Sequence, residues 1–254
     1  MPLTFYKKPA LVVYVTCGDP NLATTREVVL AAIAAGADVI ELGVPFSDPV
    51  ADGPVIQRAS ERALKQGTSL AQVLTLAAEL RQHAQSTGLV IFSYLNPILR
   101  MGIEKFCMIA RHAGVDGVLI TDLPVEEAGK YLRTMKANDL APVFLAAPTS
   151  PDARLKRLTD ASRGFVYAVS RTGVTGARQQ LATDAQKLVR RLRRVTKLPI
   201  AVGFGISTAE QFAAVGRFAD AVVVGSAIVE TIETNLGREA QAVGDFVRDL
   251  TAQN

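Results

Sequence analysis

Short apolar runs alternate with amphipathic stretches along the whole chain. The runs are rich in Val, Leu and Ile, and the stretches between them, such as 28–35 and 70–80, repeat apolar residues at helical spacing. Runs that are apolar on both faces are typical of parallel strands covered by helices. Eight strands are predicted, at 11–16, 38–43, 89–93, 115–120, 141–146, 164–169, 198–203 and 220–224.

This alternation predicts an α/β fold, a (β/α)8 TIM barrel formed by one domain over residues 1–254. The length suits such a barrel, and no linker-like segment divides the chain. An open doubly wound sheet is the alternative, because periodicity alone does not show that a sheet closes. Capping-box patterns at 69–72 and 207–210 predict two helix starts.

Composition narrows the classes of function. The net charge is only +4, and the densest basic run, 187–194, has apolar residues at helical spacing, which favours a solvated helix face over a site for nucleic acid. No apolar stretch reaches membrane-spanning length, and no signal peptide precedes the first strand. Cys17 and Cys107 form no disulfide or zinc pattern. We therefore expect a soluble, cytoplasmic protein without a metal.

Candidate chemistry gathers where the predicted strands end, as it does in barrel enzymes. Glu41 lies in an otherwise apolar strand, where loss of water should favour its neutral form and suit proton transfer. A buried cation partner or an outward orientation is the alternative. Asp52 lies in a loop rich in Pro and Gly and could simply shape a turn, but it shares a mouth with Glu41, and two carboxyl groups in different surroundings can take different roles.

Glycines indicate a second feature of the same mouth. Gly173, Gly176, Gly205 and the pair Gly225–Ser226 follow the last three predicted strands, where barrels commonly bind phosphate; ordinary tight turns are the alternative. The polar segment 171–181 is a candidate lid, and Tyr167 either lines the cavity or packs in the core. Both histidines lie in helical stretches and no lysine lies inside a predicted strand, which disfavours histidine and Schiff-base catalysis.

Several blocks resemble the signature of the tryptophan synthase α-subunit family. They are ELGVPFSDP at 41–49, ADGP at 51–54, YVTCGDP at 14–20, TDLPVEE at 121–127, SRTGVTG at 170–176, VGFGIS at 202–207 and GSAIV at 225–229. Together they cover the chain in order from about residue 11 to residue 235. Such an ordered set is far more specific than any one of its glycines.

The resemblance implies retro-aldol cleavage of indole-3-glycerol phosphate to indole and glyceraldehyde 3-phosphate, a step of tryptophan biosynthesis. It assigns acid/base catalysis to Glu41, stabilisation of the indole N–H to Asp52, and a place beside Glu41 to Tyr167. The substrate-binding residues that it implies are Arg171, Thr175, Gly176, Phe204, Gly205, Gly225 and Ser226, with Phe204 at the indole, Thr175 on the lid and the glycines and Ser226 at the phosphate.

The resemblance also implies a partner. The expected assembly is an α2β2 heterotetramer with the β-subunit, which carries the family's pyridoxal phosphate, so no cofactor is expected on this chain. Asp48, Pro49 and the turn at 96–97 correspond to β-subunit contacts. A stand-alone lyase and a non-catalytic subunit that only activates a β-subunit are the alternatives. Only about ten residues precede the first strand, so we expect the barrel floor to be closed differently from the rest of the family.

Overall fold

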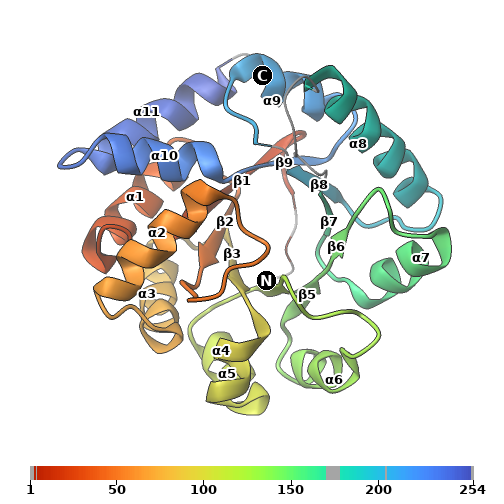
Figure 1. Cartoon of the computed structure of the whole chain (residues 1–254), viewed down its shortest axis with the longest axis horizontal. Coiled ribbons are helices and arrows are strands. Elements are labelled where there is room, and N and C mark those ends of the chain that lie inside the picture. Colours follow the sequence, from red (N-terminus) through yellow and green to blue (C-terminus); the bar gives the residue numbers. More distant parts are fainter. Residues whose placement is uncertain (1–2, 4, 170–177, 204, 253–254) are drawn as a thin grey trace.

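The computed structural model describes residues 3, 5–169, 178–203 and 205–252. In the described chain, parallel strands stand at the centre and helices surround them (Figure 1). The strands are β1 (Ala10–Thr16), β2 (Val39–Gly43), β3 (Gly88–Ser93), β4 (Gly117–Ile120), β5 (Ala141–Val143), β6 (Leu145–Ala146), β7 (Val166–Val169), β8 (Ile200–Gly203) and β9 (Ala221–Val224). All eight predicted strands are therefore confirmed to within a few residues.

The strand order shows that the sheet closes into a barrel. The order is β5-β4-β3-β2-β1-β9-β8-β7-β6, so β5 and β6 lie at the two ends of the hydrogen-bonded series. These two strands are halves of the predicted strand 141–146 and are separated only by Phe144. Its carbonyl oxygen accepts a bond from the Tyr167 N–H at 3.1 Å. The fifth barrel strand is thus interrupted rather than absent, and the open-sheet alternative is excluded.

The helices follow the strands around the outside. They are α1 (Leu22–Ala34), α2 (Pro54–Lys65), α3 (Leu70–His83), α4 (Leu95–Met101), α5 (Ile103–His112), α6 (Gly129–Ala137), α7 (Asp152–Ala161), α8 (Arg178–Arg193), α9 (Ala209–Gly216), α10 (Ser226–Thr234) and α11 (Glu239–Thr251). None of the described helices is long and apolar enough to cross a membrane. The basic run lies on α8, where Leu188, Val189 and Leu192 are buried, as the helical spacing predicted.

Of the two predicted helix starts, one needs correction. The capping box at 69–72 is present, and the Gln72 side chain accepts from the Ser69 N–H at 3.0 Å. The box predicted at 207–210 is wrong by one residue: Thr208 caps α9 and accepts from the Gln211 N–H at 3.3 Å. Residues 178–181 of the candidate lid belong to α8, which begins at Arg178, while its residues 171–177 lie outside the described chain.

Alternation along the strands divides the core into an outer and an inner layer. On β2, Ile40 and Leu42 belong to the large cluster beneath the helices, whereas Val39 belongs to the cluster inside the barrel. Side chains in a strand alternate between faces, so Glu41 shares the inner face with Val39. The Glu41 carboxyl group therefore lies inside the barrel, next to the apolar layer that contains Val39.

The floor of the barrel is closed by residues from the N-terminal segment. Leu3 is 5% exposed and packs inside the barrel, and Phe5 stacks on Phe165 with ring centroids 5.4 Å apart. Side-chain atoms of Leu3 occupy the space that a Cβ on Gly88, Gly117 or Gly164 would need, at 2.6–2.8 Å. Leu3, packed among three glycines, thus closes the floor of the barrel together with Phe5.

Candidate active site

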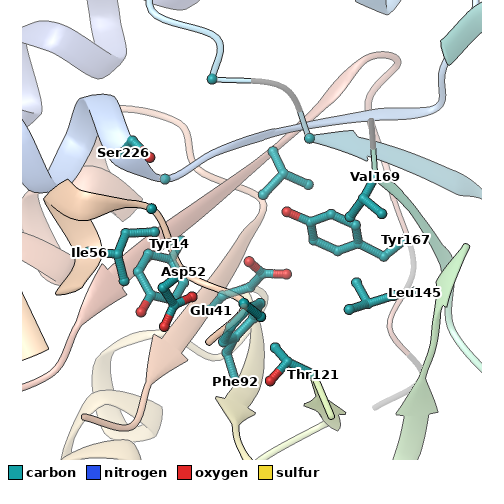
Figure 2. A pocket seen from close by; sticks show the side chains of 16 residues that line it. Tyr14, Glu41, Asp52, Ile56, Phe92, Thr121, Leu145, Tyr167, Val169 and Ser226 are labelled. Atoms are coloured by element: carbon teal, nitrogen blue, oxygen red, sulfur yellow. The ribbon is translucent and has the colours of Figure 1, made fainter. Parts of the chain in front are cut away.

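A cavity of about 240 Å³ opens at the carboxyl ends of the strands, directly above the apolar floor. Figure 2 shows the side chains that surround it. Its walls come from the strands and from the loops that follow β2, β8 and β9. The lining residues are Tyr14, Glu41, Ala51, Asp52, Gly53, Ile56, Phe92, Thr121, Leu145, Tyr167, Val169, Gly203, Gly205, Val223, Gly225 and Ser226.

Glu41 is the most unusual group in this cavity. It is fully buried, and neither carboxyl oxygen has a hydrogen-bond partner among the described residues. Burial raises the pKa of Glu41 from its usual 4.5 to about 8, so the group is mostly protonated at neutral pH. The alternative of a cation partner finds no support in the described chain. Glu41 lines the cavity as an acid that can donate a proton and recover it as a base.

Asp52 lies across the mouth in a different environment. It is half-buried; burial raises its pKa from 3.8 to about 6, and a hydrogen bond from Tyr94 partly opposes that shift. The same tyrosine hydroxyl accepts from the Ala51 N–H at 2.9 Å. At neutral pH the two carboxyl groups therefore differ: Asp52 is mostly ionised while Glu41 is mostly neutral. Separated pKa values of this kind allow one group to donate a proton and the other to stabilise positive charge.

Two tyrosines flank the carboxyl groups and are held against glycines on neighbouring strands. A Cβ on Gly43 would lie 2.4 Å from the Tyr14 hydroxyl, and one on Gly203 would lie 2.5 Å from the Tyr167 hydroxyl. Figure 2 shows the Tyr167 hydroxyl turned toward Glu41. Burial, and then the charge of Glu41, raise the pKa of Tyr167 well above 10, so its hydroxyl stays protonated. The sequence left open whether Tyr167 lines the cavity or packs in the core, and the structure places it in the lining of the cavity.

The side of the cavity formed by the loops after β8 and β9 contains the N-terminus of helix α10. Gly225 is the N-cap of α10, Ser226 is its first residue, and no side chain caps its first turn. Gly205 lines the same wall with φ at 60°, a backbone conformation that favours glycine. Backbone N–H groups at the start of a helix attract anions, so this wall has the geometry of a phosphate site.

The predicted site residues divide into two groups. The cavity brings together Glu41, Asp52, Tyr167, Gly205, Gly225 and Ser226. Arg171, Thr175, Gly176 and Phe204 lie outside the described residues, as does Gly173. Within the described chain, no group of three or more His, Cys, Asp or Glu side chains is placed to hold a metal ion.

Several residues that line or support the cavity were not among the predicted site residues. Tyr14, Phe92 and Thr121 line the cavity, and Tyr94 bonds to Asp52. The ring of Tyr14 meets that of Phe92 edge-on, with centroids 5.1 Å apart. Phe92 and Tyr94 lie at the carboxyl end of the third predicted strand, so the position that indicated chemistry at the other strand ends applies to them as well.

The fold and the cavity together define a (β/α)8 barrel enzyme whose mouth combines a neutral buried acid, a carboxylate and an anion-binding helix end. The family model of the tryptophan synthase alpha chain matches residues 3–252. The chain belongs to that family.

Relatives and solved structures agree with this assignment. The chain is 51% identical over 245 residues to the tryptophan synthase alpha chain of Methylococcus capsulatus, covering 96% of this chain and 91% of that one. For the alpha chain of Neisseria meningitidis serogroup B, identity is 48%, with 95% and 92% covered. A structure of Mycobacterium tuberculosis tryptophan synthase superposes with a TM-score of 0.88 at 37% identity, covering 96% and 92%. The tryptophan synthase complex of Pyrococcus furiosus gives 0.88 at 38%, covering 97% and 99%.

Proposed function

We propose that the protein is a carbon–carbon lyase that cleaves indole-3-glycerol phosphate to indole and glyceraldehyde 3-phosphate, as the α-subunit of a tryptophan synthase. The observation that carries the proposal is the pair of cavity carboxyl groups with separated pKa values, about 8 for Glu41 and about 6 for Asp52. Cleaving this bond needs a proton donor and a group that stabilises a cation, and both are present at neutral pH.

The reaction follows from these two groups. Glu41 gives its proton to C3 of the indole ring, and the positive charge that forms on the ring nitrogen is stabilised by the Asp52 carboxylate. The Glu41 carboxylate then takes the proton of the glycerol hydroxyl next to the ring. The carbon–carbon bond breaks, its electron pair restores the aromatic indole, and the former hydroxyl carbon becomes the aldehyde of glyceraldehyde 3-phosphate. Atoms and electrons balance without an external oxidant or reductant.

The remaining walls position the substrate. The N–H groups at the start of α10, with Gly225 and Ser226, hold the phosphate, and the rings of Tyr14 and Phe92 pack beside the indole. The Tyr167 hydroxyl, protonated and turned toward Glu41, stabilises the Glu41 carboxylate after it has given up its proton. Each group thus acts on the part of the substrate that its chemistry suits.

The proposed partner is the β-subunit, in an α2β2 heterotetramer, and the proposed location is the cytoplasm. Asp48 and Asn96, in the two predicted contact segments, are exposed, and they lie beside the exposed apolar side chains of Val50, 85% exposed, and Leu99, 53% exposed. The two segments lie close together, because the rings of Phe46 and Tyr94, which precede them in the chain, are tilted against each other with centroids 5.1 Å apart. A patch that mixes apolar and polar groups in this way suits a protein interface.

The deciding experiment measures indole release from indole-3-glycerol phosphate by the purified chain, with and without its own β-subunit. Slow release that the partner accelerates is the expected result. Fast release without any partner would instead indicate a stand-alone lyase. No release by the folded protein under either condition would contradict the lyase and leave a subunit that only activates its partner.

A further inference from the structure

Two arginines and two carboxylates join three segments around the mouth of the barrel. Arg62 on α2 donates to both oxygens of Asp19, in the loop after β1, at 2.7 and 2.8 Å. Its remaining nitrogen donates to Glu233 on α10 at 2.8 Å. Arg58, one turn earlier on α2, donates to Glu233 at 2.7 and 3.0 Å. We call these four residues the α2 clamp.

The α2 clamp differs from an ordinary surface ion pair. Asp19 is only 2% exposed and Arg62 is 33% exposed, so the pair is largely withdrawn from water. Paired, two-bond contacts of this kind are among the stronger hydrogen bonds in proteins. Hydrogen bonds from Arg58, with the charge of Arg62, lower the pKa of Glu233 to about 2. Glu233 therefore stays charged at any pH used to assay an enzyme.

Asp52 lies in the loop immediately before α2, the helix that carries both arginines of the α2 clamp. α2 begins two residues after Asp52, and the Gln57 side-chain amide donates to the Asp52 carbonyl oxygen at 2.8 Å. Arg62 lies eight residues after Pro54, or ~12 Å along the helix axis. If the tilt of α2 changes at Arg62, the start of the helix moves as well. The hydrogen bond from Gln57 then carries this movement to Asp52.

Glu233, at the other end of the α2 clamp, lies on α10, the helix whose N-terminus forms the candidate phosphate site, called here the phosphate wall. Glu233 lies near the end of α10, whose first residue, Ser226, lines the cavity. The two helices also share a small apolar cluster, in which Ala59 of α2 and Val229 of α10 lie with Tyr14. The ion pairs of the α2 clamp add directional contacts to this cluster, and only they reach the loop after β1.

We propose that Arg62 is a positioning residue: by tying α2 to α10 and to the loop after β1, it sets the distance between Asp52 and the phosphate wall. A substrate held at both places reacts only if that distance matches its own length. Small misplacements of a catalytic group reduce turnover strongly even when binding of each separate part is unchanged. The kinetic consequence rests on the proposed lyase function, whereas the placement of Asp52 does not.

The kinetic test uses Arg62→Met and Arg62→Lys. Arg62→Met should lower kcat for indole release by ~10- to 100-fold, the scale expected for misplacement of a reacting group. Competitive inhibition by inorganic phosphate should be unchanged, because the first turn of α10 is intact. Arg62→Lys should recover part of kcat, since an ammonium group can pair with Asp19 but cannot make two parallel bonds.

Stability is separated from positioning by two controls. Arg81→Met removes a partly buried, ion-paired arginine at the opposite end of the barrel, where Arg81 pairs with Asp116 at 2.6 Å and donates to the Gly114 carbonyl at 2.9 Å. It should lower Tm without lowering kcat. In Arg62→Met the buried Asp19 carboxylate has lost its cation. The double variant Asp19→Asn with Arg62→Met also removes that carboxylate. Tm should then rise relative to Arg62→Met, while kcat stays low; recovery of kcat along with Tm would overturn the proposal.

A second readout does not depend on activity. Carboxyl 13C NMR, with Asp52 assigned through Asp52→Asn, should give a lower pKa for Asp52 in Arg62→Met than in the wild type, because a displaced loop is more exposed to water. The charged or titratable neighbours, Tyr14, Tyr94 and Glu41, are the same in both proteins. An unchanged pKa together with an unchanged kcat would overturn the proposal. A shifted pKa in a protein whose wild type releases no indole would sustain it and contradict the lyase function instead.

Discussion

Replacing Glu41 by Gln should strongly reduce turnover and, at the same time, make the stability of the protein less sensitive to pH. In the folded chain the pKa of Glu41 is about 8, against 4.5 for a carboxyl group in water. Below pH 4.5 the group is protonated in both states and contributes no pH dependence. Above it, the unfolded chain loses the proton while the folded chain keeps it, so stability falls until the folded pKa is passed.

The magnitude follows from those two pKa values. Stability should fall by about 1.4 kcal/mol per pH unit in this window, or by about 2.5 kcal/mol between about pH 5.5 and about pH 7.5. Gln cannot ionise, yet it leaves a similar unpartnered polar group inside the barrel. The difference in unfolding free energy between the variant and the wild type should therefore grow in favour of the variant by about 2.5 kcal/mol over that range.

Urea denaturation of both proteins at the two pH values measures this difference, since all other titrating groups are common to them. Indole release at neutral pH should meanwhile fall by ~10²- to 10⁴-fold, the usual contribution of an acid/base group. A stability difference that is the same at both pH values would refute the claim that Glu41 is held neutral. Near-normal turnover would remove Glu41 from proton transfer.

Four further outcomes are expected. kcat/KM for indole release should depend on pH as a bell with limbs near the pKa values of Asp52, about 6, and Glu41, about 8, and Asp52→Asn should remove the acid limb, as a pH–rate profile would show. Ser226→Asp should weaken inorganic phosphate as an inhibitor through like-charge repulsion at the start of α10; unchanged inhibition would place the phosphate elsewhere. Leu3→Ala should cost about 2–4 kcal/mol in urea denaturation but leave kcat unaltered, because it opens a cavity at the floor, and a fall in kcat would contradict that separation. Gly43→Ala should lower kcat by displacing the Tyr14 ring, because the hydroxyl and the nearest ring carbons of Tyr14 would lie 2.4–2.7 Å from the new Cβ; a Gly43→Ala variant with unaltered kcat would show that the position of this ring is unimportant.

Local sequence determined the elements and the chemistry of the best-placed residues. Strand positions follow from apolar runs, and Glu41 could be singled out because it is a carboxyl group in such a run, although only the structure excluded a cation partner among the described residues. The motif blocks were specific enough to indicate the family before any geometry was known. Capping at Thr208 rather than Ser207 shows the limit of this approach, since neighbouring hydroxyl residues offer the same local pattern.

Only the tertiary structure decided whether the sheet closes, how the floor is filled and which groups surround Asp52. Closure depends on pairing across the break at Phe144, and the floor depends on Leu3 meeting three glycines from distant strands. The roles of Tyr94 and Arg62 arise in the same way, because their partners are more than 40 residues away in sequence. Periodicity describes how each segment meets an apolar layer, but it carries no information about which distant side chain completes a hydrogen bond. That choice is made when the segments pack.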